Sequence, residues 1–219
     1  IFNGVVLADD LNRATPRTQS ALLEVMEERT ISIDGKTHPM PPPFFVLATQ
    51  NPVEQQGVYD LPEAQLDRFL MQLEIGYPSL GEERRIVEEQ RQRHPIEEIE
   101  SVINADDILE EQKKARDQVK VEPNVLDYIV RLVQESRTHK DLSLGCSPRA
   151  SLALYRTAQA SSWIDGQDFV TPDTVKKLAP AVLGHRMVIK PQSRIAGVQP
   201  EDVVTEILAQ VDVPLVRMK

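Results

Sequence analysis

Two adjacent carboxylates, Asp9 and Asp10, directly follow the apolar run 5–8. The run predicts a buried parallel strand, and ligands of open α/β sheets bind where such strands end. One carboxylate at this place can hold Mg²⁺, and a second can polarise a water for attack on a phosphoryl group. Adjacent acids after a strand can also form only a solvated turn or a helix cap, so both interpretations stay open from this pattern alone.

Three further polar side chains could act on a phosphate. Asn51 follows a second apolar run, 44–48, where an amide can orient a water or contact a terminal phosphate, although a turn residue is the simpler interpretation. Arg68 ends an expected helix, where a cation complements the helix dipole or reaches a phosphate on a neighbouring subunit. Arg149 falls in the first turn of a helix expected after Ser147, where a cation opposes the dipole and a nearby anion would compensate it.

The tripeptide Gly-Lys-Thr at 35–37 matches the end of a phosphate-binding loop. That loop needs a glycine five positions earlier, where Thr30 stands. Residues 30–37 instead alternate in polarity around Asp34-Gly35, a pattern that favours a β-hairpin. We therefore expect no phosphate-binding loop in this sequence.

The elements that must position these side chains fall into two halves. Strands are predicted at 5–8, 44–48 and 71–75. Helices are predicted at 18–28, 60–69, 106–118 and 201–210, with a further apolar helical face over 125–133. Capping boxes are expected at Asp60 with Glu63 and at Ser79, and further helices after Ser147 and Thr171, each of which precedes a proline. We predict an α/β half up to residue 78 and an all-helical half after it.

Composition narrows the class of protein. The 219 residues are 41% hydrophobic and 27% charged, which is typical of a soluble globular protein, and the net charge of −9 argues against a general nucleic-acid partner. No apolar run is long enough to span a membrane, and the single Cys146 indicates a reducing, cytoplasmic compartment and a packing role. Because the sequence opens on Ile1, directly before a core strand, we expect it to be part of a longer chain.

The order of these features resembles the AAA+ ATPase module from its third core strand onward. Four segments are similar to the MoxR family of that class: 7–14, 19–29, 44–52 and 61–69. Residues 147–150 and 183–186 resemble the family's helical lid, so the resemblance covers nearly the whole chain. It implies a partial AAA+ P-loop-type parallel sheet with flanking helices, followed by an all-α lid.

The resemblance also implies domain boundaries. Residues 1–78 would form the C-terminal part of the AAA+ core, in which the hairpin at 31–39 is the family's insertion before sensor 1. Residues 79–122 would be a charged helical linker, and residues 123–219 the lid.

The same resemblance assigns a role to each candidate residue. Asp9 would be the Walker B acid that supports Mg²⁺, and Asp10 stands where the family has the glutamate that polarises the attacking water. Asn51 would be sensor 1. Arg68 would be the arginine finger, acting on a neighbouring subunit, and Arg149 would be sensor 2, acting on the phosphates of its own subunit.

ATP and Mg²⁺ are therefore the implied cofactors, and a self-assembled ring, expected to be a hexamer, is the implied assembly. The family suggests chaperone-like remodelling of a protein client and a von Willebrand A domain protein as partner. Two departures qualify this. The Walker A loop is missing, so we expect the fragment alone to be inactive. Asp10 is shorter than glutamate by about 1.5 Å, the length of one C–C bond, which can slow hydrolysis about 100-fold.

Two alternatives stay open. A magnesium-chelatase-type motor subunit, or a DNA-directed relative, would share the hairpin before sensor 1, although the net charge disfavours DNA. A non-catalytic regulatory or scaffold module with a degenerate site would suit Asp10 and the missing loop.

Overall fold

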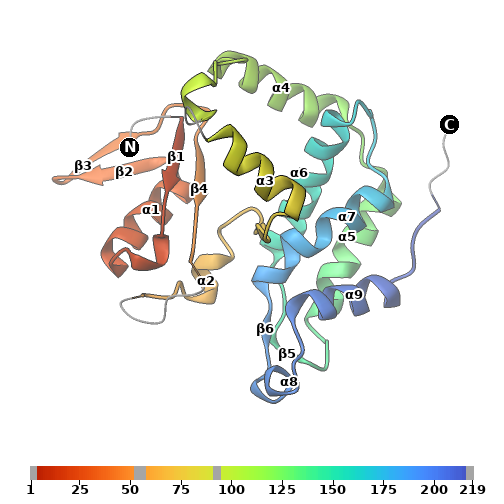
Figure 1. Cartoon of the computed structure of the whole chain (residues 1–219). Helices are drawn as coiled ribbons and strands as arrows, with labels where there is room; N and C mark the ends of the chain where they lie inside the picture. The colour runs from red at the N-terminus through yellow and green to blue at the C-terminus, as the bar shows by residue number, and fades with distance from the viewer. Residues whose placement is uncertain (1–3, 52–57, 91–94, 216–219) are drawn as a thin grey trace.

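The sheet that carries the two carboxylates is formed by β1 (Val5–Ala8) and β4 (Phe45–Ala48), which pair in parallel with Ala8 opposite Ala48. The computed structural model describes residues 4–51, 58–90 and 95–215. Figure 1 shows this sheet on the left, the helical half on the right, α3 near the centre between them and α4 along the top. The expected α/β half with a parallel sheet is confirmed.

One face of the sheet packs on α1 (Pro16–Glu28). Thr15 caps this helix by accepting a hydrogen bond from the Thr18 N–H, and Leu22, Leu23 and Val25 are its buried residues that meet the strands. The other face carries large apolar side chains that are exposed: Val5, Leu7, Phe45 and Leu47. The sheet is therefore covered on one side only within the described part of the chain.

The expected hairpin is present as β2 (Thr30–Ile33) and β3 (Lys36–Pro39), paired antiparallel. Asp34 and Gly35 form the turn, and both have positive φ, at 50° and 75°, as a two-residue turn of this type requires. Lys36 and Thr37 thus belong to a strand, which excludes a phosphate-binding loop at this tripeptide.

Two expectations for residues 60–75 are wrong. The helix at 60–69 shortens to α2 (Glu63–Leu66), with Pro62 rather than Asp60 before its first residue. Residues 71–75 are not a strand, because the described sheet offers no neighbouring strand to pair with them. The Gln72 N–H instead donates to the Ala181 carbonyl, 2.9 Å away in the helical half.

The helix expected after Ser79 is present. Ser79 and Glu82 form a capping box for α3 (Leu80–Glu89), and α4 follows as Ala105–Gln118. The lid helices are α5 (Pro123–Ser136), α6 (Pro148–Ile164), α7 (Pro172–Leu183), α8 (Pro191–Ile195) and α9 (Pro200–Gln210). Short 3₁₀ turns lie at Leu11–Arg13, Pro95–Glu98 and Gly184–Arg186. No helix in the described ranges has the length and apolarity needed to cross a membrane.

The largest hydrophobic core lies in the lid, where α5, α6, α7 and α9 meet. Ile129, Leu132 and Val133 on α5 are fully buried, as the apolar face predicted. The lid is not purely helical, however, because β5 (Leu142–Leu144) pairs antiparallel with β6 (Val188–Ile189). These strands were missed because each is too short to show an alternating pattern.

Gly145 connects β5 to α6 and passes against the end of α5. A Cβ at this position would lie 2.5 Å from the Ser136 carbonyl oxygen and 2.6 Å from the Arg137 Cα, which are both backbone atoms. We predict that Gly145→Ala lowers the free energy of unfolding by at least about 2 kcal/mol, because the backbone must shift to make room. Urea unfolding of the two proteins measures this.

Gly81→Ala is the matched control. A Cβ at Gly81, in α3, meets no atom within 4 Å, and alanine is favoured over glycine in a helix by about 0.5–1 kcal/mol. An unchanged stability for Gly145→Ala would contradict the close approach.

Candidate functional site

The carboxyl ends of β1 and β4 bring Asp9 beside Thr49. The Thr49 N–H donates to the Ala8 carbonyl at 3.0 Å, which continues the sheet, and the Thr49 hydroxyl donates to Asp9 Oδ1 at 2.6 Å. The Asp10 N–H in turn donates to the same hydroxyl at 2.9 Å. Thr49 therefore fixes both acids, a role that the sequence did not predict, although its hydroxyl stands at the strand end next to the expected site.

Asp10 adopts a left-handed conformation, with φ 48° and ψ 50°. Aspartate tolerates this region better than longer side chains do. Its carboxylate pairs with Arg13, with Oδ2 3.4 Å from Nε. The turn thus directs the two carboxylates differently. Asp9 contacts the end of β4, and Asp10 contacts the 3₁₀ turn that follows it in the chain.

The side-chain amides of Asn12 and Gln19 donate hydrogen bonds to backbone carbonyls near the end of β4. The buried Asn12 side chain donates from Nδ2 to the Asn51 carbonyl at 3.3 Å, and the Tyr59 N–H donates to the Asn12 carbonyl at 2.6 Å. Gln19 on α1 donates to the carbonyls of Tyr59 and Leu11, at 2.8 and 3.2 Å. Asn51 therefore lies at the same sheet edge as Asp9, held by residues that sequence analysis did not assign.

The oxygen donors at this edge fit Mg²⁺. The Asp9 carboxylate is exposed and accepts the Thr49 hydroxyl through one oxygen. Mg²⁺ in proteins takes one or two carboxylates and completes its octahedron with water and phosphate oxygens. Asp9 could therefore offer such an ion an exposed carboxylate oxygen.

The two candidate arginines meet at one carboxylate. Arg68, just after α2, places Nη1 2.9 Å from Glu27 Oε2, and Arg149, in the first turn of α6, pairs through Nη2 with Glu27 Oε1. Glu27 lies in the last turn of α1. Sequence analysis missed Glu27, because its partners are 41 and 122 residues away along the chain.

Asp67 and Arg186 fasten the start of α6 beside these arginines. Asp67 Oδ2 accepts the Ser147 hydroxyl at 2.8 Å, and Asp67 Oδ1 lies 3.1 Å from Arg186 Nε. The Arg186 guanidinium also donates to the Phe69 and Leu70 carbonyls, at 2.6 and 3.3 Å. Burial lowers the pKa of Arg186, and Asp67 opposes that shift. Asp67 therefore offsets part of the cost of burying this cation.

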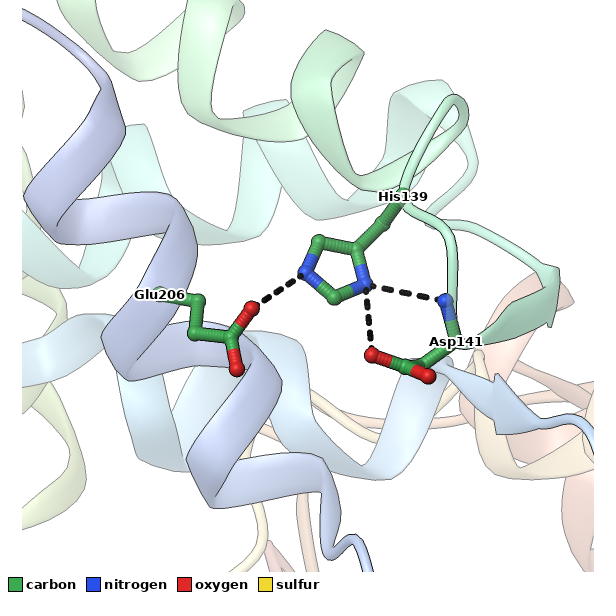
Figure 2. A group of neighbouring side chains, drawn as sticks. All are labelled: His139, Asp141 and Glu206. Carbon is green, nitrogen blue, oxygen red and sulfur yellow. Dashed lines mark hydrogen bonds and ion pairs between the residues drawn. The ribbon is translucent and has the colours of Figure 1, made fainter. Parts of the chain in front are cut away.

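A second cluster lies in the lid, away from these residues. His139, in the turn after α5, meets Glu206 of α9 with Nε2 3.4 Å from Oε2, and meets Asp141 with Nδ1 4.0 Å from Oδ2 (Figure 2). The Asp141 N–H donates to Nδ1 at 3.3 Å, so this ring nitrogen acts as an acceptor. The Lys140 ammonium lies 3.4 Å from Glu206 and 3.9 Å from Asp141.

The three side chains of this second cluster each offer one possible metal ligand, and these atoms lie within 4.8 Å of one another. The two carboxylates approach different ring nitrogens of His139, as Figure 2 shows. A lysine cation already lies beside both acids. We interpret the cluster as an ion-pair network that joins the turn after α5 to α9. Cys146 is also buried, and burial raises the pKa of its thiol to about 11.

Comparisons with known proteins agree with this architecture. Residues 1–71 match the family model described as "ATPase family associated with various cellular activities (AAA)", and residues 134–207 match an AAA lid domain. A candidate ATPase of known structure from Cytophaga hutchinsonii superimposes with a TM-score of 0.91 at 31% identity, covering 98% of this chain and 68% of that one. The fold and these matches thus define an AAA+ ATPase module with its lid.

Two curated relatives narrow the class. The chain is 47% identical to protein YeaC of Bacillus subtilis over 99% of its own length and 68% of YeaC. It is 41% identical to chaperone MoxR1 of Mycobacterium tuberculosis over 96% of its own length, and spans only 58% of MoxR1. The chain belongs to the MoxR family of AAA+ ATPases.

His185 makes the lid contact sensitive to acid. Its Nε2 lies 3.2 Å from the Phe69 carbonyl, and burial, assisted by Arg186, lowers its pKa to about 4. The unfolded chain has the ordinary value near 6.5. Between these values the unfolded state binds a proton that the folded state excludes, so stability falls as pH drops from 6.5 to 4.

We predict that His185→Gln removes this component, which is at most about 3 kcal/mol across that range. Urea unfolding at several pH values measures it, and His38→Gln in the β2–β3 hairpin controls for the loss of a histidine. Identical pH slopes for His185→Gln and the unmodified protein would contradict the prediction.

Proposed function

We propose that the full-length protein is an ATP-hydrolysing motor subunit that remodels or matures protein complexes in a chaperone-like manner. The observation that carries this proposal is the sheet edge, where Asp9 ends β1 beside Thr49 at the end of β4. An acid at a parallel strand end beside a polar side chain of the next strand is suited to Mg²⁺ and phosphoryl transfer. Membership of the MoxR family supports the assignment to ATP.

The proposed roles come from the resemblance of these segments to the MoxR family. Asp9 would support Mg²⁺, Asp10 would polarise the attacking water, and Asn51, as sensor 1, would orient that water or contact the terminal phosphate. Arg68 would act as the arginine finger across a subunit interface, which requires a ring, and we propose a hexamer. Arg149 would act as sensor 2.

The two arginines constrain each other in this proposal. Because Arg68 and Arg149 both contact Glu27, they would reach one phosphate together in this conformation. For Arg149 to serve its own subunit while Arg68 serves a neighbour, the two side chains would have to separate from Glu27. Subunit mixing separates the two possibilities.

The fragment alone is proposed to be inactive. Its sequence lacks the loop whose backbone N–H groups would bind the phosphates. The exposed apolar face of β1 and β4, and the exposed Leu73 and Ile75, support further chain packing there in the full-length protein. We keep the proposed domains as 1–78, 79–122 and 123–219.

Three parts of this proposal rest on the family resemblance alone: a protein client, a von Willebrand A domain partner and a cytoplasmic location. The runners-up are a magnesium-chelatase-type motor and a non-catalytic scaffold. Hydrolysis of ATP by the full-length protein separates a motor from the scaffold, and purification with a von Willebrand A domain protein would favour the MoxR-type role.

In the full-length protein, we predict that Asp10→Glu speeds ATP hydrolysis about tenfold or more, because the longer side chain brings the carboxylate to the attacking water. Steady-state hydrolysis measures this. Asp34→Glu is the control, since Asp34 also has a positive φ, at 50°, but lies in the hairpin turn. A slower or unchanged Asp10→Glu enzyme of normal stability would show that Asp10 is not the water-polarising group.

We also predict that Arg68→Ala and Asp9→Asn each abolish hydrolysis in a homogeneous ring, by about a thousandfold for the arginine, and that a mixture of the two regains activity. Some mixed interfaces then join an intact Asp9 to an intact Arg68 on the next subunit. The same mixture with Arg149→Ala regains activity only if Arg149 also acts across the interface. An Arg68→Ala ring with unchanged hydrolysis would return Arg68 to the role of a helix-end cation.

A further inference from the structure

One glutamate holds both candidate phosphate-binding arginines. The Glu27 carboxylate uses Oε2 for Arg68 and Oε1 for Arg149, so each oxygen carries one guanidinium. Glu27 comes from α1, Arg68 from the segment that follows α2, and Arg149 from the first turn of α6. Their side chains are 33%, 34% and 46% exposed for Glu27, Arg68 and Arg149, so solutes can reach the cluster.

The charges of this cluster do not balance. Two guanidinium cations surround one carboxylate, which leaves a net charge of +1 that attracts a further anion. Carboxylate and phosphate groups can each accept two parallel N–H hydrogen bonds from one guanidinium. Glu27 therefore occupies donors that a terminal phosphate would use.

Helix stability does not account for a carboxylate at this place. The last turn of α1 holds both Glu27 and Glu28, and that turn contains no basic residue. Negative charge at a helix C-terminus opposes the helix dipole. The favourable partners of Glu27 are thus the two arginines, which come from elsewhere in the chain.

We propose that Glu27 is an internal anion that competes with phosphate for Arg68 and Arg149 and holds both arginines together until phosphate displaces it. The inference rests on the proposed function for the identity of the phosphate as that of ATP. Glu27 acts through the arginines and is a positioning residue. Because Arg149 belongs to the lid and Glu27 to α1, displacement would also release one contact between the lid and the sheet half.

The test uses the full-length protein and two probes, inorganic phosphate and a non-hydrolysable ATP analogue. Removing the charge with Glu27→Gln is expected to lower the apparent dissociation constant for phosphate about fivefold, the range of one or two partly exposed ion pairs. The rise of Tm with phosphate, at constant ionic strength, measures this constant. The concentration of analogue that drives ring assembly should fall by a similar factor.

Glu28→Gln is the matched control, because it removes the same charge from the same helix end while the ion pairs of Arg68 and Arg149 go to Glu27. Glu27→Asp, which keeps the charge on a shorter side chain, should fall between the two. Combining Glu27→Gln with Arg149→Ala should abolish the gain in phosphate affinity. If Glu27→Gln unfolds the protein, the phosphate affinity of Glu27→Asp is compared with that of the unmodified protein instead.

The outcomes separate the two proposals. Tighter phosphate binding by Glu27→Gln without any ATP hydrolysis by the unmodified protein supports the internal anion and overturns the proposed function. Active hydrolysis with phosphate binding unchanged or weakened by Glu27→Gln overturns the internal anion and leaves the proposed function standing. An equal gain in phosphate affinity from Glu28→Gln would show that the effect depends only on the net charge of the helix end, and would also overturn the inference.

Discussion

The buried ion pair between Asp67 and Arg186 is the constraint on which the rest of the site depends. The Arg186 side chain is 2% exposed, and it reaches the Asp67 carboxylate and two carbonyls of the segment after α2. Removing one partner of such a pair leaves an uncompensated buried charge, which costs about 3–5 kcal/mol. The lid therefore cannot leave the sheet half at this point without a large loss of stability.

This junction also determines where the functional arginines lie. Asp67 precedes Arg68 directly and binds the Ser147 hydroxyl at the start of α6, two residues before Arg149. The pair therefore fixes both backbones from which the arginines extend. Their meeting at Glu27 follows from this geometry, since Glu27 lies in the last turn of α1, which packs on the adjoining sheet.

Sequence was sufficient where the determinant is local. The hairpin turn at Asp34-Gly35, the capping box at Ser79 and the end of β1 before Asp9 each depend on a few neighbouring residues. It failed where a distant partner decides. Residues 71–75 alternate as a strand does, yet a strand needs a neighbour to pair with. Glu27, Asp67 and Arg186 were likewise missed, because their partners lie as far as 122 residues away. The assigned roles of Asp9, Asp10 and Asn51 are still predictions.

Two carboxylates that bind arginine in this structure differ in one physical respect, their access to solvent. Asp67 is 18% exposed and its partner is almost fully buried, so a dissolved anion cannot replace it without the cost of stripping water from the new ion. Glu27 and its partners are each about a third or more exposed, so an incoming phosphate exchanges one solvated anion for another. The same pairing of charges can therefore be permanent at Asp67 and exchangeable at Glu27. Burial, rather than the choice of residue, separates the fixed part of the lid contact from the part that a ligand can alter.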